Sequence, residues 1–200
     1  MLLTVSLASS RLKMHKGATS TQKKQLSTAA KDNLSSVRTD LDSLLAHIGN
    51  GGIYYPARLK DDSKSIEVEN FQESNLVVLD FDNNNPDSDV PTLSWSQALE
   101  HPYVQAHAAF LHESPNFSGE QHRYRIGFIL PETIADYYVW KEVAARIAAH
   151  FPEQYDFILR PTWGYHGCRR RSIGGKRTQV LSRLEFDQLT DGIIEEQERR

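Results

Sequence analysis

The chain has little that would place it in a membrane or an oxidising compartment. It holds one cysteine, Cys168, in 200 residues, so a disulfide framework and a zinc site built from several cysteines are excluded. No apolar run approaches the roughly 20 residues that a membrane-spanning helix needs, and the start Met1–Leu7 lacks the basic lead of a signal peptide. We therefore expect a cytoplasmic protein with no membrane partner.

The chain also lacks a strong net charge, since its formal charge is −3. A hydrophobic content of 39% and a charged content of 24% are ordinary for a globular domain. The distribution of charge is more informative. The segment from Arg160 to Arg183 has seven Lys or Arg and no acid, whereas 80–89 is acidic. One segment is thus suited to anions and another to cations.

Hydrophobic periodicity predicts an α+β or mixed α/β domain without internal repeats. Helices are expected over 20–48, 93–101 and 133–150. Strands are expected at 2–8, 53–59, 65–69, 76–82, 123–130 and 178–184, and 104–111 is expected to lead into another.

The apolar run 76–82 ends in two carboxylates, Asp80 and Asp82. Side chains alternate along a strand, so the two project from one side, about 7 Å apart along the chain. Two carboxylates on one face repel each other, and a hard divalent cation between them removes that cost. The plainer interpretation is a strand that runs into the polar turn 83–87.

Two later features complement this pair. Arg123 and Arg125 lie on one face of a predicted strand, and Asp156 precedes the glycine-containing basic segment 169–177. Alone, each could be a solvated strand, a capping carboxylate or a solvated hairpin. Together, three carboxylates could hold two Mg²⁺ or Mn²⁺ ions, and arginine forks with a lysine could hold a triphosphate for in-line displacement.

These motifs resemble the archaeo-eukaryotic primase superfamily, particularly the primase-polymerases of plasmid, phage and cellular replication. The family's first motif is an apolar strand ending in Asp-x-Asp, as at Asp80 and Asp82. Its third is an apolar residue and Asp, followed by Arg and Lys before a strand, as at Asp156 and 169–176. The resemblance covers roughly residues 50–185.

The resemblance implies a catalytic domain over 1–190, with an α/β part at about 1–90 packed on a part at about 91–190 related to RNA-recognition domains. The site would lie in the cleft between them, and 191–200 would be a helical tail or the start of a linker. The implied activity is template-directed primer or DNA synthesis with two Mg²⁺ or Mn²⁺ ions. The implied partners are single-stranded DNA, nucleoside triphosphates and a helicase domain or protein. The residues that carry these roles are Asp80, Asp82 and Asp156 for metal and catalysis, Arg123, Arg125, Arg170 and Lys176 for nucleotide, and Arg169, Arg171 and Arg177 for DNA.

The chain departs from the family at the second motif, a Ser-x-His on a strand. Arg123 and Arg125 stand at those two places, so Arg125 is expected to bind the triphosphate instead. His122 and His166 are candidates for the missing imidazole.

Three other functions stay open. One is a catalytically silent domain of the same ancestry that binds nucleic acid. Another is a haloacid-dehalogenase-like phosphatase, although that family's aspartate lies near the start of its domain. The third is a calcium-binding loop from Asp80, although Asn85 and Pro91 stand where an EF-hand needs glycine and glutamate.

Overall fold

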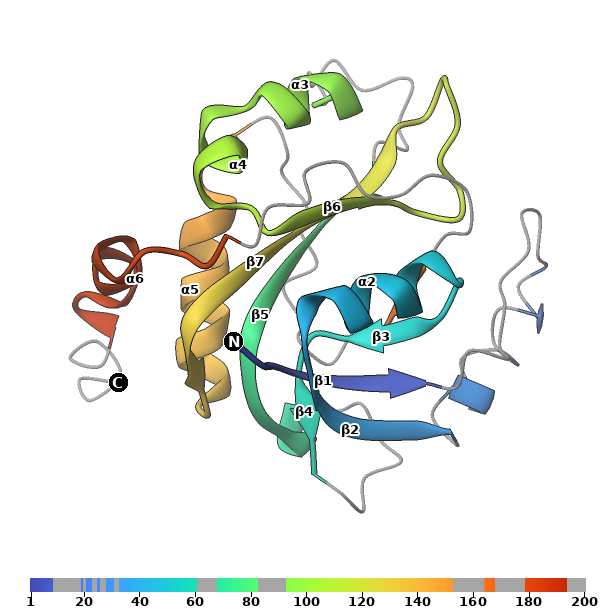
Figure 1. Cartoon of the computed structure of the whole chain (residues 1–200), viewed down its shortest axis with the longest axis horizontal. Coiled ribbons are helices and arrows are strands. Elements are labelled where there is room, and N and C mark those ends of the chain that lie inside the picture. Colours follow the sequence, from blue (N-terminus) through green and yellow to red (C-terminus); the bar gives the residue numbers. More distant parts are fainter. Residues whose placement is uncertain are drawn as a thin grey trace.

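The computed structural model describes residues 1–8, 19, 21–22, 25, 28–30, 33–60, 68–82, 93–152, 164–167 and 179–193. These residues form two four-stranded sheets in which all paired strands are antiparallel, together with helices that lie against them (Figure 1). The predicted α+β class is confirmed. The expected relation of one part to RNA-recognition domains stays a prediction.

The first sheet has the order β2-β1-β3-β8. Strand β2 pairs with β1 along all six of its residues, and the short β8 joins the sheet through β3. The chain therefore returns to its N-terminal sheet after residue 160. The strands of this sheet are β1 (Leu3–Ala8), β2 (Leu34–Thr39), β3 (Ile53–Tyr55) and β8 (Tyr165–His166).

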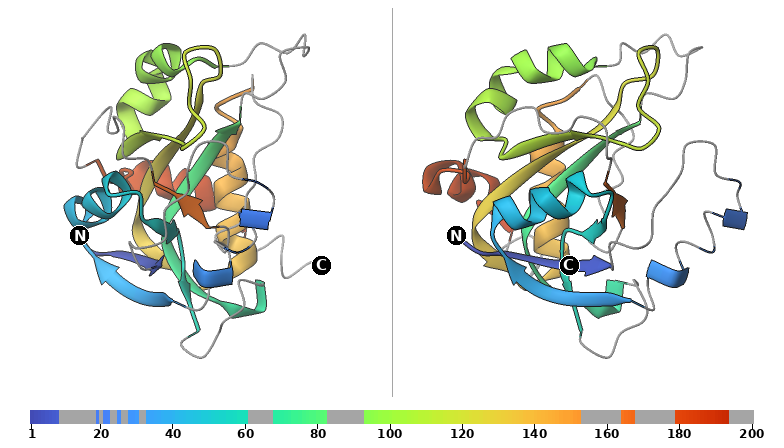
Figure 2. Two further views of the ribbon diagram at one scale, coloured as in Figure 1. Left: turned by 90° about the vertical axis from the view of Figure 1, so that its right-hand side faces the viewer. Right: turned by 45° about the vertical axis from the view of Figure 1, so that its right-hand side comes forward.

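The second sheet has the order β4-β5-β7-β6, and its two long central strands cross the molecule (Figure 2). Asn75 ties it to the first sheet, because its side chain accepts from the Thr4 amide at 2.9 Å and donates to the Leu2 carbonyl at 2.9 Å. The strands of this sheet are β4 (Arg58–Leu59), β5 (Phe71–Asp82), β6 (Phe110–Glu113) and β7 (Arg123–Ile134).

Polar residues cap the helices at their N-termini, as the orphan amides of a first turn require. Asp40, Ser94, Asp136 and Ser182 each accept backbone hydrogen bonds there, and Ser94 forms a capping box with Gln97. The helices are α2 (Leu41–Gly49), the 3-10 helix η1 (Val68–Asn70), α3 (Trp95–Glu100), α4 (Pro102–His107), α5 (Tyr137–Ala148) and α6 (Arg183–Thr190).

Alternation along β5 separates two hydrophobic cores. Val77, Leu79 and Phe81 belong to a core shared with α3, α4, α5 and α6. Leu76 and Val78 belong to a core shared with α2 and the first sheet. Because Asp80 follows Val78 by two residues, it lies on the face of β5 that looks toward the first sheet.

The prediction of one helix over 20–48 is wrong in its middle. Residues 21–22, 25 and 28–30 are helical, but Leu34–Thr39 is the strand β2. Asp40 caps α2 by accepting from the Ser43 amide at 2.8 Å, so that helix cannot extend backwards. The three- and four-residue spacing of leucines spans two helices and a strand, and pairing with β1 overrides it.

Two further predictions are wrong in segments that contain or follow a proline. The strand expected over 53–59 divides at Pro56 into β3 and β4, which belong to different sheets. Pro56 has no amide hydrogen to continue a ladder. In the stretch 104–111, the helix α4 runs from Pro102 to His107 before β6 begins, since proline is favoured in a first helical turn.

The ends of two elements also differ from prediction. Strand β7 continues to Ile134, so the helix expected from 133 begins at Tyr137, after its cap Asp136. The strand expected over 178–184 is reduced to a bridge between Ile129 and Val180 because α6 begins at Arg183. In the strand expected over 65–69, residues 68 and 69 belong to η1 and the rest lie outside the described residues.

The predicted domain division stays a prediction. Its internal boundary near residue 90 and the last part of the expected tail, 194–200, lie outside the described residues. Among the helices that the structure describes, none is long and apolar enough to cross a bilayer.

Candidate active site

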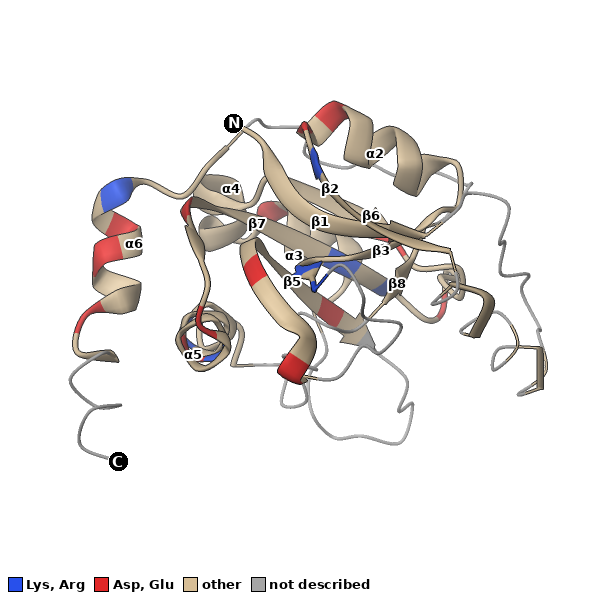
Figure 3. Ribbon diagram, turned by 90° about the horizontal axis from the view of Figure 1, so that it is seen from below, with Lys and Arg blue, Asp and Glu red and all other residues tan. Residues whose placement is uncertain are grey.

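The acids and arginines predicted from sequence lie opposite one another in the second sheet. Strand pairing places Asp80 beside Arg125 and Asp82 beside Arg123, and β6 adds His112 on the far side of Arg125. Figure 3 shows acidic and basic stretches of β5 and β7 side by side near β8. The prediction that the arginine strand pairs with the Asp80–Asp82 strand is confirmed.

Local sequence determines which side chains share this face. Gly127 follows Arg125 by two residues and pairs with Phe110. A Cβ atom on Gly127 would lie 2.2 Å from the Phe110 ring, so only glycine lets that ring lie flat on β7. Phe110 in turn stacks beside His112, with ring centroids 6.1 Å apart. The paired residues Asp80, Arg125 and His112 therefore lie next to the hydrophobic core between the sheets.

Asp80 and Arg125 form an ion pair that is largely removed from solvent. The Arg125 Nε donates to Oδ1 of Asp80 at 3.0 Å, and the exposed fractions of the two side chains are 10% and 17%. A buried charge pair of this kind costs desolvation and persists only with further hydrogen bonds. Arg125 has such a bond, because its Nη1 donates to the His166 carbonyl at 2.7 Å.

Strand β8 brings Tyr165 and His166 to this pair. The Arg125 guanidinium lies 5.0 Å from the centre of the Tyr165 ring, in a cation–π arrangement. The Gly167 amide donates to the Gly52 carbonyl at 2.8 Å. A Cβ atom on Gly167 would lie 2.2 Å from the Ile48 carbonyl oxygen, so β8 ends at a position that a larger residue could not occupy.

A second buried pair, His112 and Tyr54, lies next to Arg125. His112 Nδ1 lies 2.9 Å from the Glu113 carbonyl, which only accepts, so Nδ1 carries the hydrogen. Nε2 must then accept from the Tyr54 hydroxyl at 2.8 Å. Burial, with the positive charge of Arg125, lowers the pKa of His112 to about 3. His112 is therefore neutral at pH 7.

The same surroundings shift the other titrating groups. Burial raises the pKa of Tyr54 and of Tyr165. Burial and Arg125 lower the pKa of His166 to about 4, so this imidazole is also neutral at pH 7. Tyr165 donates to the Val78 carbonyl at 3.3 Å. Apart from Asp80, the titrating groups described around Arg125 are therefore neutral at pH 7.

The donor chemistry of the acidic pair suits a hard divalent cation, since Asp80 and Asp82 offer carboxylate oxygens. Arg125 engages Oδ1 of Asp80, and none of the hydrogen bonds among described residues uses Oδ2. Within the described ranges, no group of three or more His, Cys, Asp or Glu is placed to hold a metal ion. Asp156, the third predicted ligand, lies outside them.

The remaining predicted residues divide into two groups. Arg123 begins β7, is half-buried and faces Asp82 across the ladder. The basic residues of the segment that follows β8 lie outside the described residues: Arg169, Arg170, Arg171, Lys176 and Arg177.

Of the two candidate histidines, only His166 contacts the ion pair, and it does so through its backbone carbonyl. His122 accepts from the Trp95 amide at 3.0 Å and stacks on Phe117. Sequence reasoning missed Tyr54, His112 and Tyr165. The signal for His112 was weak: it follows the apolar residues Phe110 and Leu111 but precedes Glu113.

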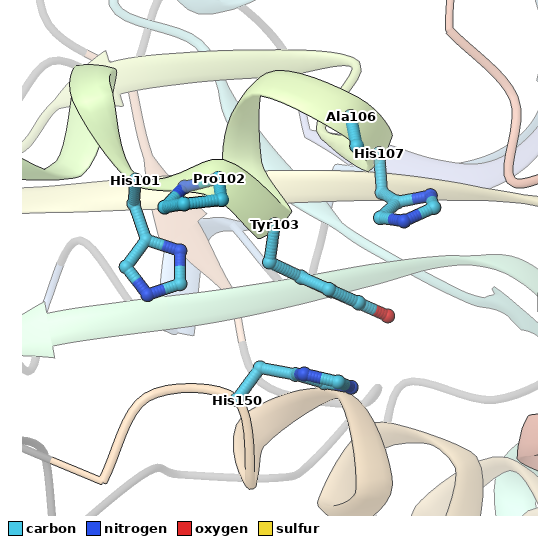
Figure 4. Close-up of a pocket in the computed structure, with 6 residues that line it drawn as sticks. All are labelled: His101, Pro102, Tyr103, Ala106, His107 and His150. Carbon is cyan, nitrogen blue, oxygen red and sulfur yellow. The ribbon is translucent and has the colours of Figure 1, made fainter.

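A hollow of about 460 Å³ lies elsewhere, on the opposite face of the second sheet. Tyr103 lies between His107 and His150, and its ring stacks on His150 with centroids 3.7 Å apart (Figure 4). The Tyr103 hydroxyl donates to Glu185 at 3.0 Å. The lining residues are His101, Pro102, Tyr103, Ala106, His107 and His150.

No protein-family model and no curated protein sequence matches the chain. Among solved structures, the chain is similar to the AEP domain of the primase-polymerase of cyanophage S-2L, at 11% sequence identity and a TM-score of 0.45. The alignment covers 94% of this chain and 89% of that one. At this identity and TM-score the likeness assigns no family, no residue role and no activity to this chain.

Proposed function

We propose that this chain is a nucleotidyltransferase that adds nucleotides to a primer strand on a single-stranded DNA template. The observation that carries the proposal is the register of β5 and β7, which sets Asp80 beside Arg125 and Asp82 beside Arg123. Two carboxylates and two guanidiniums at the same strand ends offer oxygen ligands for divalent cations and positive charge for phosphate.

Asp80 and Asp82 would hold Mg²⁺ or Mn²⁺, with Asp156 as the third carboxylate of a site for two ions. Bound ions of this kind lower the pKa of an attacking hydroxyl and stabilise a leaving pyrophosphate. The protein's part is to hold the carboxylates on a rigid strand, and β5 does so because it pairs with β7 continuously from Leu76 to Asp82.

Arg123 is the described arginine best suited to the triphosphate. It lies at the start of β7 and is more exposed than Arg125. The basic residues of 169–177 would complete the phosphate site and the DNA contact. His166 would supply the imidazole that the family's second motif provides, since it is neutral at pH 7 and lies beside the ion pair.

The direct test is nucleotide incorporation on a primed and an unprimed single-stranded template, with Mg²⁺ or Mn²⁺. We expect activity in the wild type and a loss of at least 100-fold in Asp80→Asn and in Asp82→Asn. Glu132→Gln is the matched control, because it removes a carboxylate from the far end of β7, where Glu132 pairs with Arg183. Equal activity in all variants would exclude the assignment.

Template binding is the second test. Neutralising phosphates with Lys and Arg releases counterions, so affinity for single-stranded DNA should fall steeply with salt. A variant with Arg169, Arg170 and Arg171 changed to Ala should bind more weakly and show a shallower salt dependence. A flat dependence in the wild type would contradict a template cleft.

The ion pair between Asp80 and Arg125 favours one competing function, a nucleic-acid-binding domain without catalysis. Arg125 already compensates the charge of Asp80, which is what a site that no longer binds metal would require. In that case the wild type would bind single-stranded DNA with the same salt dependence and would incorporate no nucleotide with either metal.

A further inference from the structure

We propose that Arg125 is a positioning residue, which holds Asp80 and the Tyr165–His166 strand together and does not bind the nucleotide. Its consequence for catalysis rests on the proposed function. The link that Arg125 makes between the two sheets does not depend on the proposed function.

The first argument is the occupancy of the guanidinium. The exposed fraction of Arg125 is 8% for the whole residue and 10% for the side chain. Its Nε and Nη1 donate to two different acceptors, Asp80 Oδ1 at 3.0 Å and the His166 carbonyl at 2.7 Å. A bidentate grip on phosphate uses two parallel N–H groups of one fork. Each fork of the guanidinium contains one of these two nitrogens, so a phosphate held by two N–H groups would share a nitrogen that already donates to Asp80 or to the His166 carbonyl, in a largely buried site.

The second argument is the orientation of Asp80. A carboxylate at a strand end can rotate about its side-chain bonds, and a bond to one oxygen removes that freedom. Among the described residues, Arg125 bonds to Oδ1 alone. Arg125 would thereby fix the orientation of Asp80 and leave Oδ2 available to a ligand.

The third argument is the weakness of β8 on its own. This strand has two residues, and among the described strands it pairs only with β3. The Arg125 bond to the His166 carbonyl and the Tyr165 bond to the Val78 carbonyl link it to the second sheet. Arg125 therefore supplies one of the two described side-chain bonds that hold β8 against β5 and β7.

The fourth argument is what supports Arg125 from behind. Tyr165, on which the guanidinium rests, packs against Tyr54 with ring centroids 5.6 Å apart. Tyr54 is in turn bonded to the neutral His112. These rings leave Arg125 little room to swing toward a substrate, which a phosphate-binding arginine needs.

The experiment compares Arg125→Ala and Arg125→Lys with Arg38→Ala. This control removes the charge of an exposed arginine from Glu73, a carboxylate that also pairs with Arg58. Hydrogen exchange is measured on a peptide covering 164–167 in the full chain. Nucleotide incorporation gives kcat and KM for the nucleotide separately. Circular dichroism confirms that each variant is folded.

We expect Arg125→Ala to exchange at least tenfold faster at 164–167 and to lose at least tenfold in kcat with KM changed less than twofold. Arg125→Lys should recover only part of each, because one ammonium cannot reach both acceptors with the same geometry. Arg38→Ala should match the wild type in both measurements.

Two results would overturn the proposal: a tenfold rise in KM with unchanged kcat and exchange, or full recovery of both by Arg125→Lys. If the wild type incorporates no nucleotide, the proposed function fails, and the exchange measurement alone decides whether Arg125 ties β8 to the second sheet.

Discussion

On each face of the second sheet a tyrosine packs beside a histidine, and the two sites differ in what surrounds the tyrosine. Between the sheets, Tyr54 bonds to a fully buried His112 beside the Asp80–Arg125 pair. On the other face, Tyr103 stacks on the exposed His150 and bonds to Glu185 at the rim of an open hollow. The hollow of about 460 Å³ therefore lies beside the cluster with fewer buried charges.

This difference shows that convergence of charge, and not the size of a hollow, marks the candidate site. Around Tyr103, partial burial lowers the pKa of His150, with Glu185 opposing and His107 and His101 adding to the shift. His150 there is exposed and Glu185 is half-buried. Around Tyr54, the side chains of Tyr54, His112, Asp80 and Arg125 each have a buried partner, so removing one partner should cost far more in the free energy of unfolding.

The largest expected effect is that of Asp80→Ala on stability. It leaves the Arg125 charge buried without its carboxylate, which should cost about 3–5 kcal/mol in the free energy of unfolding. Asp187→Ala is the control, since Asp187 pairs with Arg183 at 2.8 Å but both are more than half exposed. That change should cost about 0.2–1 kcal/mol. Urea denaturation measures both, and equal costs would contradict the comparison.

Gly167→Ala should have the next largest effect. Its new Cβ would meet the Ile48 carbonyl at 2.2 Å, and a backbone atom cannot move aside as a side chain can. We expect a cost of about 1–3 kcal/mol and faster exchange at Tyr165 and His166. Gly119→Ala, where no atom lies within 4 Å of the new Cβ, should stay within about 0.5 kcal/mol of the wild type.

The same substitution in the two clusters compares them directly. Tyr54→Phe leaves the Nε2 acceptor of His112 buried and unsatisfied, at a cost of about 1–3 kcal/mol. Tyr103→Phe removes a bond to Glu185, whose half-buried carboxylate can turn to water, so the cost should be about 0.5–1 kcal/mol. Thermal denaturation of both variants gives the order, and a larger loss in Tyr103→Phe would reverse our assignment.

The smallest expected effect is on the slope of stability with pH. The folded-state pKa of His112 is about 3 and that of His166 about 4, below the ordinary value of about 6.5. Between these values the unfolded chain binds protons that the folded chain does not, so stability falls as pH is lowered below about 6.5. Each histidine contributes at most about 1.4 kcal/mol per pH unit.

His166→Gln should flatten that slope by about 1 kcal/mol per pH unit. His150→Gln should change it much less, because His150 is exposed. Urea denaturation between pH 7 and pH 5 measures both slopes. If both variants flattened the slope of stability with pH equally, the buried His166 and the exposed His150 would not differ in their contribution to it.

The sequence by itself determined the strand that ends in Asp80 and Asp82, the shared face of Arg123 and Arg125, and the pairing of these two strands. It could do so because alternation along a strand is a local property that neighbouring residues set. The apolar stripe of α5 was predictable for the same reason, since it repeats within one helix.

Only the tertiary structure decided which groups meet Arg125. His166 comes from a two-residue strand, too short for any periodicity, and lies 41 positions away in the chain. The Tyr54–His112 bond spans 58 positions. Such contacts depend on how two sheets pack, which no local pattern records. The sequence predicted Arg125 as a phosphate ligand, and this stays a prediction. An arginine's partners are set by the fold, and the ones that the structure shows are Asp80 and the His166 carbonyl.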